Sequence, residues 1–352
     1  MRREKIECLN GNGWDAVLVS KPASVLYLTG FGGEGMLLVR GRDLVMFTDS
    51  RFDEQAVQEI PDIPVVLWEL TAKMDAVSAK VRELGIKKLG IEEHVLDYGT
   101  YQALTAGGGF ECVPVGQAVD ALRYAKDEEE IDNMQRAVRI AEKAFMQVLG
   151  IIRPGITERR VGAELEYAMR RLGGQGVSFD PIVASGPING AIPHNQPTDR
   201  VLQRGDLVTM DFGCRLGGYC SDLTRTVAIG EPDPKLREIY QIVLDAQLKA
   251  IDALAAGKRG CDVDGVARRY IEQKGYGKYF GHGLGHSLGL EIHEDPRLSP
   301  RDETILKDGM AVTVEPGIYI PGLGGVRIED DCIVKNGGCL DLVSAPKGWI
   351  SL

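Results

Sequence analysis

Three of the chain's five histidines lie within twelve residues, in the glycine-rich stretch from Gly281 to Glu294. They are His282, His286 and His293. The glycines between them disfavour a helix, because each glycine costs about 1 kcal/mol relative to alanine. A strand or loop whose backbone approaches a bound group accommodates such glycines better. Because imidazole is a common metal ligand and proton carrier, the cluster predicts an active site rather than a set of surface histidines.

Two pairs of acids share one arrangement. The pairs are Asp211 with Asp222, and Glu315 with Glu329. Turn residues lie between the members of each pair, at Gly217-Gly218 and Pro321-Gly322. If each segment folds as a hairpin, its two acids come close across the strands, where Cβ atoms are roughly 4.5–5.5 Å apart. Four carboxylates in one cleft cannot all stay ionised without a cation, so the pairs predict a metal centre that His286 would complete.

The predicted ligand set is rich in oxygen. Four carboxylates and one imidazole favour Mn²⁺ or Co²⁺, and they are also compatible with Fe²⁺ or Zn²⁺. The number of acids suits two ions about 3.5–4 Å apart that share a water or hydroxide, which is an arrangement for hydrolysis. Asp222 or Glu329 alone would be interpreted as a solvated turn residue. The duplicated setting of Asp211 and Glu315 on apolar strands favours the metal centre.

The elements that position these acids belong to an internal repeat. The segment 202–213 aligns with 306–317 at a shift of 104 residues, with five identical positions and an acid at the same place in each. Internal duplication explains this match. We therefore expect two similar helix–helix–strand halves that face each other. The predicted helices span 127–152 and 157–172 in the first half, and 233–256 and 262–274 in the second.

Local signals predict where these helices begin and end. Asp127 and Glu130 form a capping-box pattern, and Thr157 can cap the next helix. Asp233-Pro234 begins the third helix, with proline in its first turn. We expect Gly257 to end that helix.

The first 124 residues have a different pattern and predict a separate α/β domain over 1–124. Apolar runs at 15–20, 35–40, 43–48 and 63–68 predict strands, with helices at 52–60 and 72–84. Glu92-Glu93-His94 fits a solvated loop better than a metal site. No GxGxxG follows a strand there, which argues against a nucleotide site. The acids and the other histidines belong to a second domain over 125–352.

Composition narrows the class of protein and its partners. The 352 residues are 44% hydrophobic and 26% charged, as in an ordinary globular protein. A net charge of −10 argues against nucleic acid as a partner. We expect no membrane span and no secretory signal, because the required apolar runs are missing. The seven scattered cysteines lack a CxxC pair, which favours free thiols and a cytoplasmic location.

Taken together, the motifs resemble the pita-bread metallopeptidases, in the branch of aminopeptidase P (Xaa-Pro aminopeptidase) and prolidase (Xaa-Pro dipeptidase). Segments 26–31 and 47–56 resemble the creatinase/prolidase N-terminal domain, and 122–131 resembles the start of the catalytic domain. The resemblance covers essentially the whole chain. It implies an α/β N-terminal domain and an α+β pita-bread (creatinase/aminopeptidase) domain with an internal pseudo-twofold repeat.

Position by position, the resemblance implies two divalent ions held by five residues. These ligands are Asp211, Asp222, His286, Glu315 and Glu329. It implies that Asp211 and Glu329 bridge the ions and that Glu315 also shuttles a proton. The residues implied around the ligands are His194, His282, His293 and Arg327.

The resemblance also implies a role for each of these four residues. His293 would stabilise the oxyanion or assist proton transfer to the proline nitrogen. His282 and His194 would orient the substrate. Arg327 would anchor the bridging acids, or would serve only as an ion-pair partner.

The implied activity is hydrolysis of the Xaa-Pro bond at the N-terminus of short peptides, by attack of a metal-bridging hydroxide. The stretch 280–286 is closer to short bacterial aminopeptidase P proteins than to prolidases, so aminopeptidase action leads and dipeptidase action is the alternative. A methionine aminopeptidase would not explain the N-terminal domain, and metal-free creatinase would not need the intact ligands. A non-catalytic pita-bread binding protein is the alternative from another class. The resemblance further suggests a homodimer.

Overall fold

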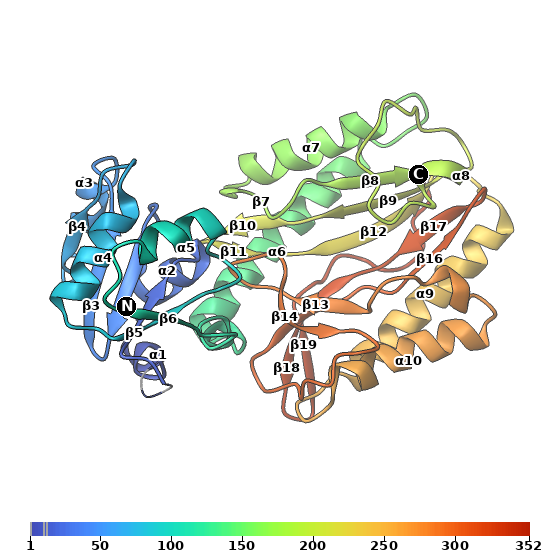
Figure 1. Ribbon diagram of the computed structural model, residues 1–352. Coiled ribbons are helices and arrows are strands. Elements are labelled where there is room, and N and C mark those ends of the chain that lie inside the picture. Colours follow the sequence, from blue (N-terminus) through green and yellow to red (C-terminus); the bar gives the residue numbers. More distant parts are fainter. Residues whose placement is uncertain (1, 10, 12) are drawn as a thin grey trace. The chain divides into compact units, whose positions relative to one another are not determined.

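The structure, a computed structural model, describes residues 2–9, 11 and 13–352. The chain forms two compact units, residues 1–123 and residues 124–352 (Figure 1). Each unit has its own sheets and its own hydrophobic core. Among the described residues, no helix combines the length and the apolar character that crossing a membrane requires.

The first unit is built on one six-stranded mixed sheet in the order β4-β3-β2-β1-β5-β6. The strands are β1 (Ala16–Val19), β2 (Met36–Arg40), β3 (Asp43–Thr48), β4 (Val65–Leu67), β5 (Lys88–Ile91) and β6 (Glu111–Pro114). The helices are α1 (Arg3–Glu7), α2 (Pro22–Thr29), α3 (Asp53–Glu59), α4 (Lys73–Glu83) and α5 (Tyr98–Thr105), followed by the 3-10 turn η1 (Asp120–Arg123). The central strands β1, β2 and β3 are antiparallel, whereas β4, β5 and β6 join parallel to their neighbours.

Helix α4 supplies much of the core of this unit. Its Met74, Val77 and Val81 recur on one helical face and are buried with Leu18 and Phe47 of the sheet. The strands and helices predicted in this region are confirmed, with small shifts at their ends. Helices α1, α2 and α5 and strands β5 and β6 were not predicted.

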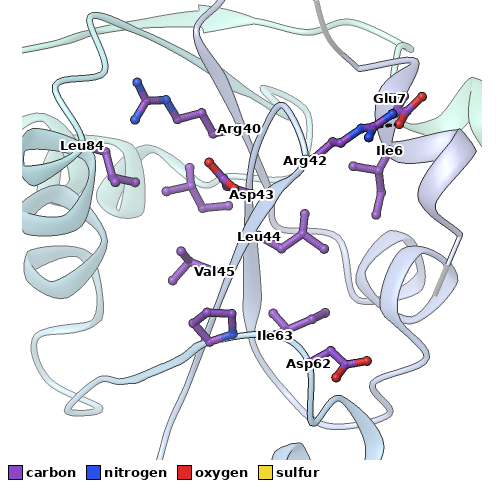
Figure 2. A pocket seen from close by; sticks show the side chains of 12 residues that line it. Ile6, Glu7, Arg40, Arg42, Asp43, Leu44, Val45, Asp62, Ile63 and Leu84 are labelled. Carbon is purple, nitrogen blue, oxygen red and sulfur yellow. Dashed lines mark ion pairs between the residues drawn. The ribbon is translucent and has the colours of Figure 1, made fainter.

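A hollow of about 580 Å³ in the first unit is lined by residues of the β2–β3 hairpin and by residues such as Ile63 and Leu84. Figure 2 shows these lining side chains. Leu44, Val45 and Ile63 contribute to its apolar lining. At its rim, the Arg42 guanidinium pairs with the Glu7 carboxylate at 2.8 Å. Among the described residues, its lining includes no histidine or cysteine, and its acids are exposed to solvent. The charged residues that line it are all exposed to solvent.

The second unit has helix pairs packed on small antiparallel sheets. Its helices are α6 (Glu128–Leu149), α7 (Glu158–Arg171), α8 (Gly186–Asn189), α9 (Pro234–Ala253) and α10 (Gly260–Gln273), with the 3-10 turn η2 (Gly277–Tyr279). The strands of its first half are β7 (Gly176–Val177), β8 (Ile182–Ser185), β9 (Leu207–Phe212), β10 (Cys214–Leu216), β11 (Tyr219–Cys220) and β12 (Leu223–Ala228). The strands of its second half are β13 (Gly285–Ser287), β14 (Glu294–Leu298), β15 (Ala311–Val314), β16 (Gly317–Ile320), β17 (Gly324–Arg327), β18 (Asp330–Lys335) and β19 (Gly338–Asp341).

Most of the predicted helix ends are confirmed. The capping box at the start of α6 forms, and the Thr157 side chain caps α7 by accepting a hydrogen bond from a backbone N–H. The prediction that Gly257 ends the third helix is wrong, because α9 ends at Ala253. Leu254 leaves the helix in an extended conformation and is fully buried, so packing into the core ends the helix before the glycine is reached.

The two halves of this unit repeat one plan, as predicted (Figure 1). In the first half, α6 and α7 accompany the sheet β12-β9-β8, and Phe145 of α6 stacks on Phe212 of β9. In the second half, α9 and α10 accompany the sheet β14-β13-β15-β18-β19. An antiparallel bridge between Thr224 and Glu329 joins the two sheets. The predicted acids of both halves therefore lie near this junction.

Candidate active site

A pocket of about 410 Å³ in the second unit brings together all of the residues predicted for the site. These are Asp211, Asp222, His286, Glu315 and Glu329, with His194, His282, His293 and Arg327. The larger hollow in the first unit includes none of them. The chemistry-bearing residues are therefore gathered in one place.

The first pair of acids comes from the β9–β12 hairpin. Asp211 lies within β9 opposite Thr224, and Asp222 directly precedes β12. The two acids are therefore diagonal neighbours across the strands rather than direct partners. A Cβ on Gly213 would collide with the carbonyl oxygen of Ser221, so only glycine allows the two strands to pass so closely between the acids.

The second pair flanks the β16–β17 hairpin. Glu315 follows β15, and Glu329 lies between β17 and β18. The turn between β16 and β17 contains Gly322 with φ +80°, as expected for a turn glycine. The hydroxyl of Thr224 donates to Glu329 Oε2 at 2.5 Å, and that of Thr313 donates to Glu315 Oε1 at 3.1 Å. Both acids are thus held by neighbouring hydroxyls.

His286 of β13 is arranged as a neutral ligand. Its Nδ1 lies 3.1 Å from the carbonyl oxygen of Ser287, which can only accept, so Nδ1 carries the hydrogen. Its Nε2 lies 3.6 Å from Asp222 Oδ2 and 3.5 Å from Glu315 Oε1. Burial, with His293 nearby, lowers the pKa of His286 to about 3. The Nε2 lone pair therefore points into the acid cluster.

The acid cluster is poorly neutralised by the protein itself. Burial raises the pKa of Glu315 to about 8, although the guanidinium of Arg327 opposes the shift. Burial and the neighbouring carboxylates raise the pKa of Asp222 and of Glu329 well above their ordinary values. A cation at this position would remove the conflict.

The cluster fits a divalent metal ion. Asp222, His286 and Glu329 each offer a ligand atom, and these atoms lie within 4.8 Å of one another. The Oδ1 atoms of Asp211 and Asp222 are buried and have no hydrogen-bond partner among the described residues. Such buried, unpaired carboxylate oxygens are rare in proteins and suit a hard cation. These residues would hold the metal.

Arg327 of β17 contacts one of the predicted ligands directly. Its Nη2 donates to Asp211 Oδ2 at 2.6 Å. Its Nε donates to the Thr224 hydroxyl at 3.2 Å, and its Nη1 donates to the Pro193 carbonyl at 3.2 Å. The buried guanidinium therefore joins an acid of the first half to the loop that carries His194.

Tyr319 of β16 was not predicted from the sequence. Its hydroxyl accepts a hydrogen bond from Arg327 Nη1 at 2.7 Å and lies 3.1 Å from His282 Nε2. His282 Nδ1 lies 2.8 Å from the Gly283 carbonyl, so Nδ1 carries the hydrogen and Nε2 accepts from Tyr319. Burial, reinforced by Arg327, lowers the pKa of His282 to about 4. A tyrosine in a strand is usually a core residue. The contact of Tyr319 with Arg327 and His282 can be seen only in the folded structure.

The rim of the pocket carries imidazole and guanidinium groups. The ring of His293 lies 4.5 Å from that of His286, edge to face, and is itself exposed. His194 is exposed in the loop after α8. Arg297 of β14, also not predicted, lines the same pocket with a side chain that is 52% exposed. The pocket thus has an acidic floor and a rim that can meet an anionic or polar substrate.

Comparisons with known proteins agree with this geometry. Residues 132–336 match metallopeptidase family M24, and residues 2–125 match the creatinase/prolidase N-terminal domain. A protein of Pyrococcus horikoshii named Xaa-Pro dipeptidase is 41% identical over 98% of this chain and 97% of its own length. The solved structure of an Xaa-Pro dipeptidase from Bacillus anthracis has a TM-score of 0.96 at 45% identity, covering 99% of both chains. That of an X-Pro aminopeptidase from Thermotoga maritima has a TM-score of 0.91 at 38% identity, covering 100% of both chains.

The matches confirm the resemblance and the pita-bread fold that were predicted from the sequence. The segment that matches the family covers more than half of the chain and includes the four acids and His286. The chain therefore belongs to metallopeptidase family M24, as a metal-dependent hydrolase that also carries a creatinase/prolidase N-terminal domain.

Proposed function

We propose that this enzyme hydrolyses the peptide bond before proline in short peptides, with residues 125–352 as the catalytic domain and 1–124 as the N-terminal domain. The observation that carries the proposal is the buried cluster of Asp222, His286 and Glu329, whose ligand atoms lie within 4.8 Å of one another. The choice of proline peptides is supported by the names of the similar proteins from Pyrococcus horikoshii and Bacillus anthracis.

The proposed cofactor is a pair of divalent ions, with Mn²⁺ or Co²⁺ favoured over Zn²⁺ or Fe²⁺. The ligands are Asp211, Asp222, His286, Glu315 and Glu329. Four carboxylates against the single guanidinium of Arg327 leave more negative charge than one divalent ion balances, which supports two ions. When bound, the ions polarise the scissile carbonyl and lower the pKa of the attacking water.

Glu315 and Arg327 are proposed to have different roles in the reaction. Glu315 is proposed to carry a proton from the attacking water to the leaving nitrogen, because it lies in the cluster and also lines the pocket. Arg327 holds Asp211 in place through the 2.6 Å hydrogen bond.

Three histidines are proposed to act on the substrate. His293 and His194 are exposed at the rim, where His293 meets the developing oxyanion or the proline nitrogen and His194 orients the peptide. His282 is held in one tautomer by Gly283 and Tyr319, which suits a group that binds the scissile amide.

Two candidate substrate lengths each have support. Arg297 at the rim can pair with the terminal carboxylate of a dipeptide, and a longer peptide would place that charge elsewhere. The name of the Pyrococcus horikoshii relative also favours dipeptidase action. Aminopeptidase action on longer peptides, which the sequence favoured, is supported by the likeness to the Thermotoga maritima enzyme.

The test compares three peptides on metal-stripped protein that is then supplied with Mn²⁺ or Co²⁺. We expect metal-dependent cleavage of Ala-Pro and Ala-Pro-Ala, and no cleavage of Ala-Ala-Ala. The ratio of dipeptide to tripeptide cleavage then distinguishes dipeptidase from aminopeptidase. Metal binding without cleavage of any peptide would instead support a binding protein.

We also propose a cytoplasmic homodimer. The seven cysteines are free thiols in the structure, as expected in a reducing compartment. The dimer rests on the family resemblance alone. Analytical ultracentrifugation is expected to give twice the mass of one chain, and the mass of one chain would contradict the proposal.

A further inference from the structure

We propose that Glu158, a buried acid outside the ligand set, is a positioning residue that fixes the loop carrying His194 and so acts on substrate binding through that histidine. The inference rests on the proposed function, because it assigns His194 to the substrate. It adds a residue that neither the family match nor the sequence motifs single out.

The loop that carries His194 has little structure of its own. Residues 190–200, which follow α8, form only turns and a bend, and the next residue, Val201, makes an isolated bridge with Thr157. His194 and its neighbour Ile192 are exposed there, so packing does not hold the tip. Backbone N–H groups of Glu158 and Arg159 donate to the carbonyl oxygens of Arg200 and Thr198 at the end of the loop. The residues nearer to His194 are held by side chains that anchor them.

Glu158 provides such an anchor. It is the first residue of α7 and is fully buried. Its Oε1 accepts from the backbone N–H and the hydroxyl of Ser185 at 2.9 and 2.6 Å. Its Oε2 accepts from Asn189 Nδ2 at 2.9 Å, and from the hydroxyl and the N–H of Thr198 at 2.6 and 3.2 Å. Asn195 Nδ2 lies 3.4 Å from the same oxygen.

These donors bracket His194 on both sides. Asn189 precedes it, whereas Asn195 and Thr198 follow it. Asn195 also donates to the carbonyl oxygen of Val183 in β8, at 2.9 Å. The Glu158 carboxylate therefore holds the residues on both sides of His194 close to strand β8. Glu158 lies at the N-terminus of α7, and a helix N-terminus favours a negative charge.

The tip of the loop has a second anchor that leads into the catalytic centre. Arg327 Nη1 donates to the carbonyl oxygen of Pro193, next to His194, while its Nη2 binds Asp211. Glu158 fixes the base of the loop, and Arg327 fixes its tip. The position of the imidazole relative to the metal ligands is then set by these two charged groups.

Glu142 offers a matched control. It is another buried carboxylate, on α6, and its Oε1 accepts from the N–H and hydroxyl of Ser344 and from the N–H of Ala345. It anchors the segment near the C-terminus, which does not line the pocket. A purely structural role for Glu158 would make the two acids behave alike.

The first test compares Glu158→Gln with Glu142→Gln in the full chain with saturating Mn²⁺. The glutamine keeps the size of the side chain but turns one acceptor oxygen into an N–H donor that faces other donors. We expect kcat/KM for Ala-Pro to fall about 10- to 100-fold in E158Q at unchanged bound metal, and about 2-fold or less in E142Q. Amide hydrogen exchange over 190–198 should accelerate only in E158Q.

A double-mutant cycle with His194→Ala tests whether Glu158 acts through the histidine. If it does, the double variant loses no more kcat/KM than H194A alone, because the two changes remove the same interaction. Multiplied losses would overturn the proposal, as would equal effects of E158Q and E142Q on rate and exchange.

A second variant covers the case in which E158Q does not fold. Thr198→Val keeps the side-chain shape and removes the hydroxyl that donates to Glu158 and accepts from Asn189 Nδ2 and the Arg200 N–H. We expect faster exchange in the loop and a loss of about 3- to 10-fold in kcat/KM, and unchanged exchange would contradict the proposal. If the wild-type enzyme cleaves no proline peptide, the proposed function fails, whereas the exchange measurements still decide whether Glu158 holds the loop.

Discussion

The two halves of the second unit have similar folds but contribute different numbers of residues to the candidate active site. Asp211 and Glu315 occupy equivalent places in the repeat, and each half adds a further acid. The second half also contributes His282, His286 and His293, whereas the first contributes only His194 from a loop. Duplication therefore accounts for the acids that surround the metal site. Most of the histidines proposed to act on the substrate are additions to the second half, whereas His194 is an addition to the first half and the proposed proton carrier Glu315 is one of the duplicated acids.

Two buried arginines connect the halves in opposite directions. Arg225 of β12 donates to the Asp330 carboxylate at 2.8 Å and to the Glu329 carbonyl at 2.7 Å in the second half. Arg327 of β17 reaches back to Asp211 in the first half. Only Arg327 lines the pocket, so we infer that Arg225 maintains the fold while Arg327 orients a ligand.

The largest effect is expected from removing one acid of either half. Asp222→Asn and Glu329→Gln should each lower Ala-Pro cleavage more than about 1000-fold, or about 4 kcal/mol in the barrier, because both residues are proposed ligands. Bound metal, measured by mass spectrometry, should fall in both variants. Retained metal and activity in one variant alone would show that the halves do not share the site.

A large loss of stability is expected from Arg225→Met. It removes the donor to Asp330 Oδ1 and to the buried carbonyls of Glu329 and Ala345, whereas Gln247 and Lys347 still contact Asp330 Oδ2. We expect a loss of about 3 kcal/mol, at the lower end for a broken buried ion pair. Urea unfolding measures this loss. The folded fraction should keep its bound metal, and a specific loss of metal at unchanged stability would contradict the assigned role.

The repeat places glycines at equivalent positions, Gly213 and Gly317, with different neighbours. A Cβ at Gly213 would meet the backbone carbonyl of Ser221, whereas at Gly317 it would meet the end of the Tyr319 side chain. We expect Gly213→Ala to cost about 3 kcal/mol of unfolding free energy, because the backbone cannot move aside. Gly317→Ala should cost less, about 2 kcal/mol, but it should displace the Tyr319 ring and break its hydrogen bonds with Arg327 and His282. Equal costs in denaturant unfolding would show that the local packing does not differ.

A smaller effect is expected from Tyr319→Phe, which removes the hydroxyl between Arg327 and His282. We expect kcat/KM to fall about 10-fold, the lower end for groups that orient a site, with bound metal unchanged. Tyr240→Phe is the control, because that hydroxyl donates to the carbonyls of Lys347 and Gly348 outside the pocket. Equal losses in both variants would argue against a role for Tyr319.

The parts of the molecule that could be predicted are those with a periodic or repeated pattern of residue types in the sequence. Strands β1 to β4 of the first unit appear as apolar runs, and the acids appear through the repeat. Helix α2 was not predicted because it is short and its apolar residues do not form an amphipathic stripe. The early end of α9 depends on the burial of Leu254, which is a tertiary effect.

The parts of the site that were not predicted depend on contacts between distant segments. Tyr319 and Arg297 are ordinary strand residues in sequence, and their place in the pocket follows from strand register. In the sequence, Glu158 is an ordinary acid in the first turn of a predicted helix. Its role can be inferred only from the structure, where Ser185 and Thr198 donate to it.

The most direct test of the account is a titration of Mn²⁺ into metal-stripped enzyme, with bound metal and Ala-Pro cleavage measured in parallel. The account predicts no cleavage without metal, two bound ions per chain at saturation, and activity that rises with occupancy. Cleavage by the folded, metal-free protein would contradict the central claim that these acids act through bound metal.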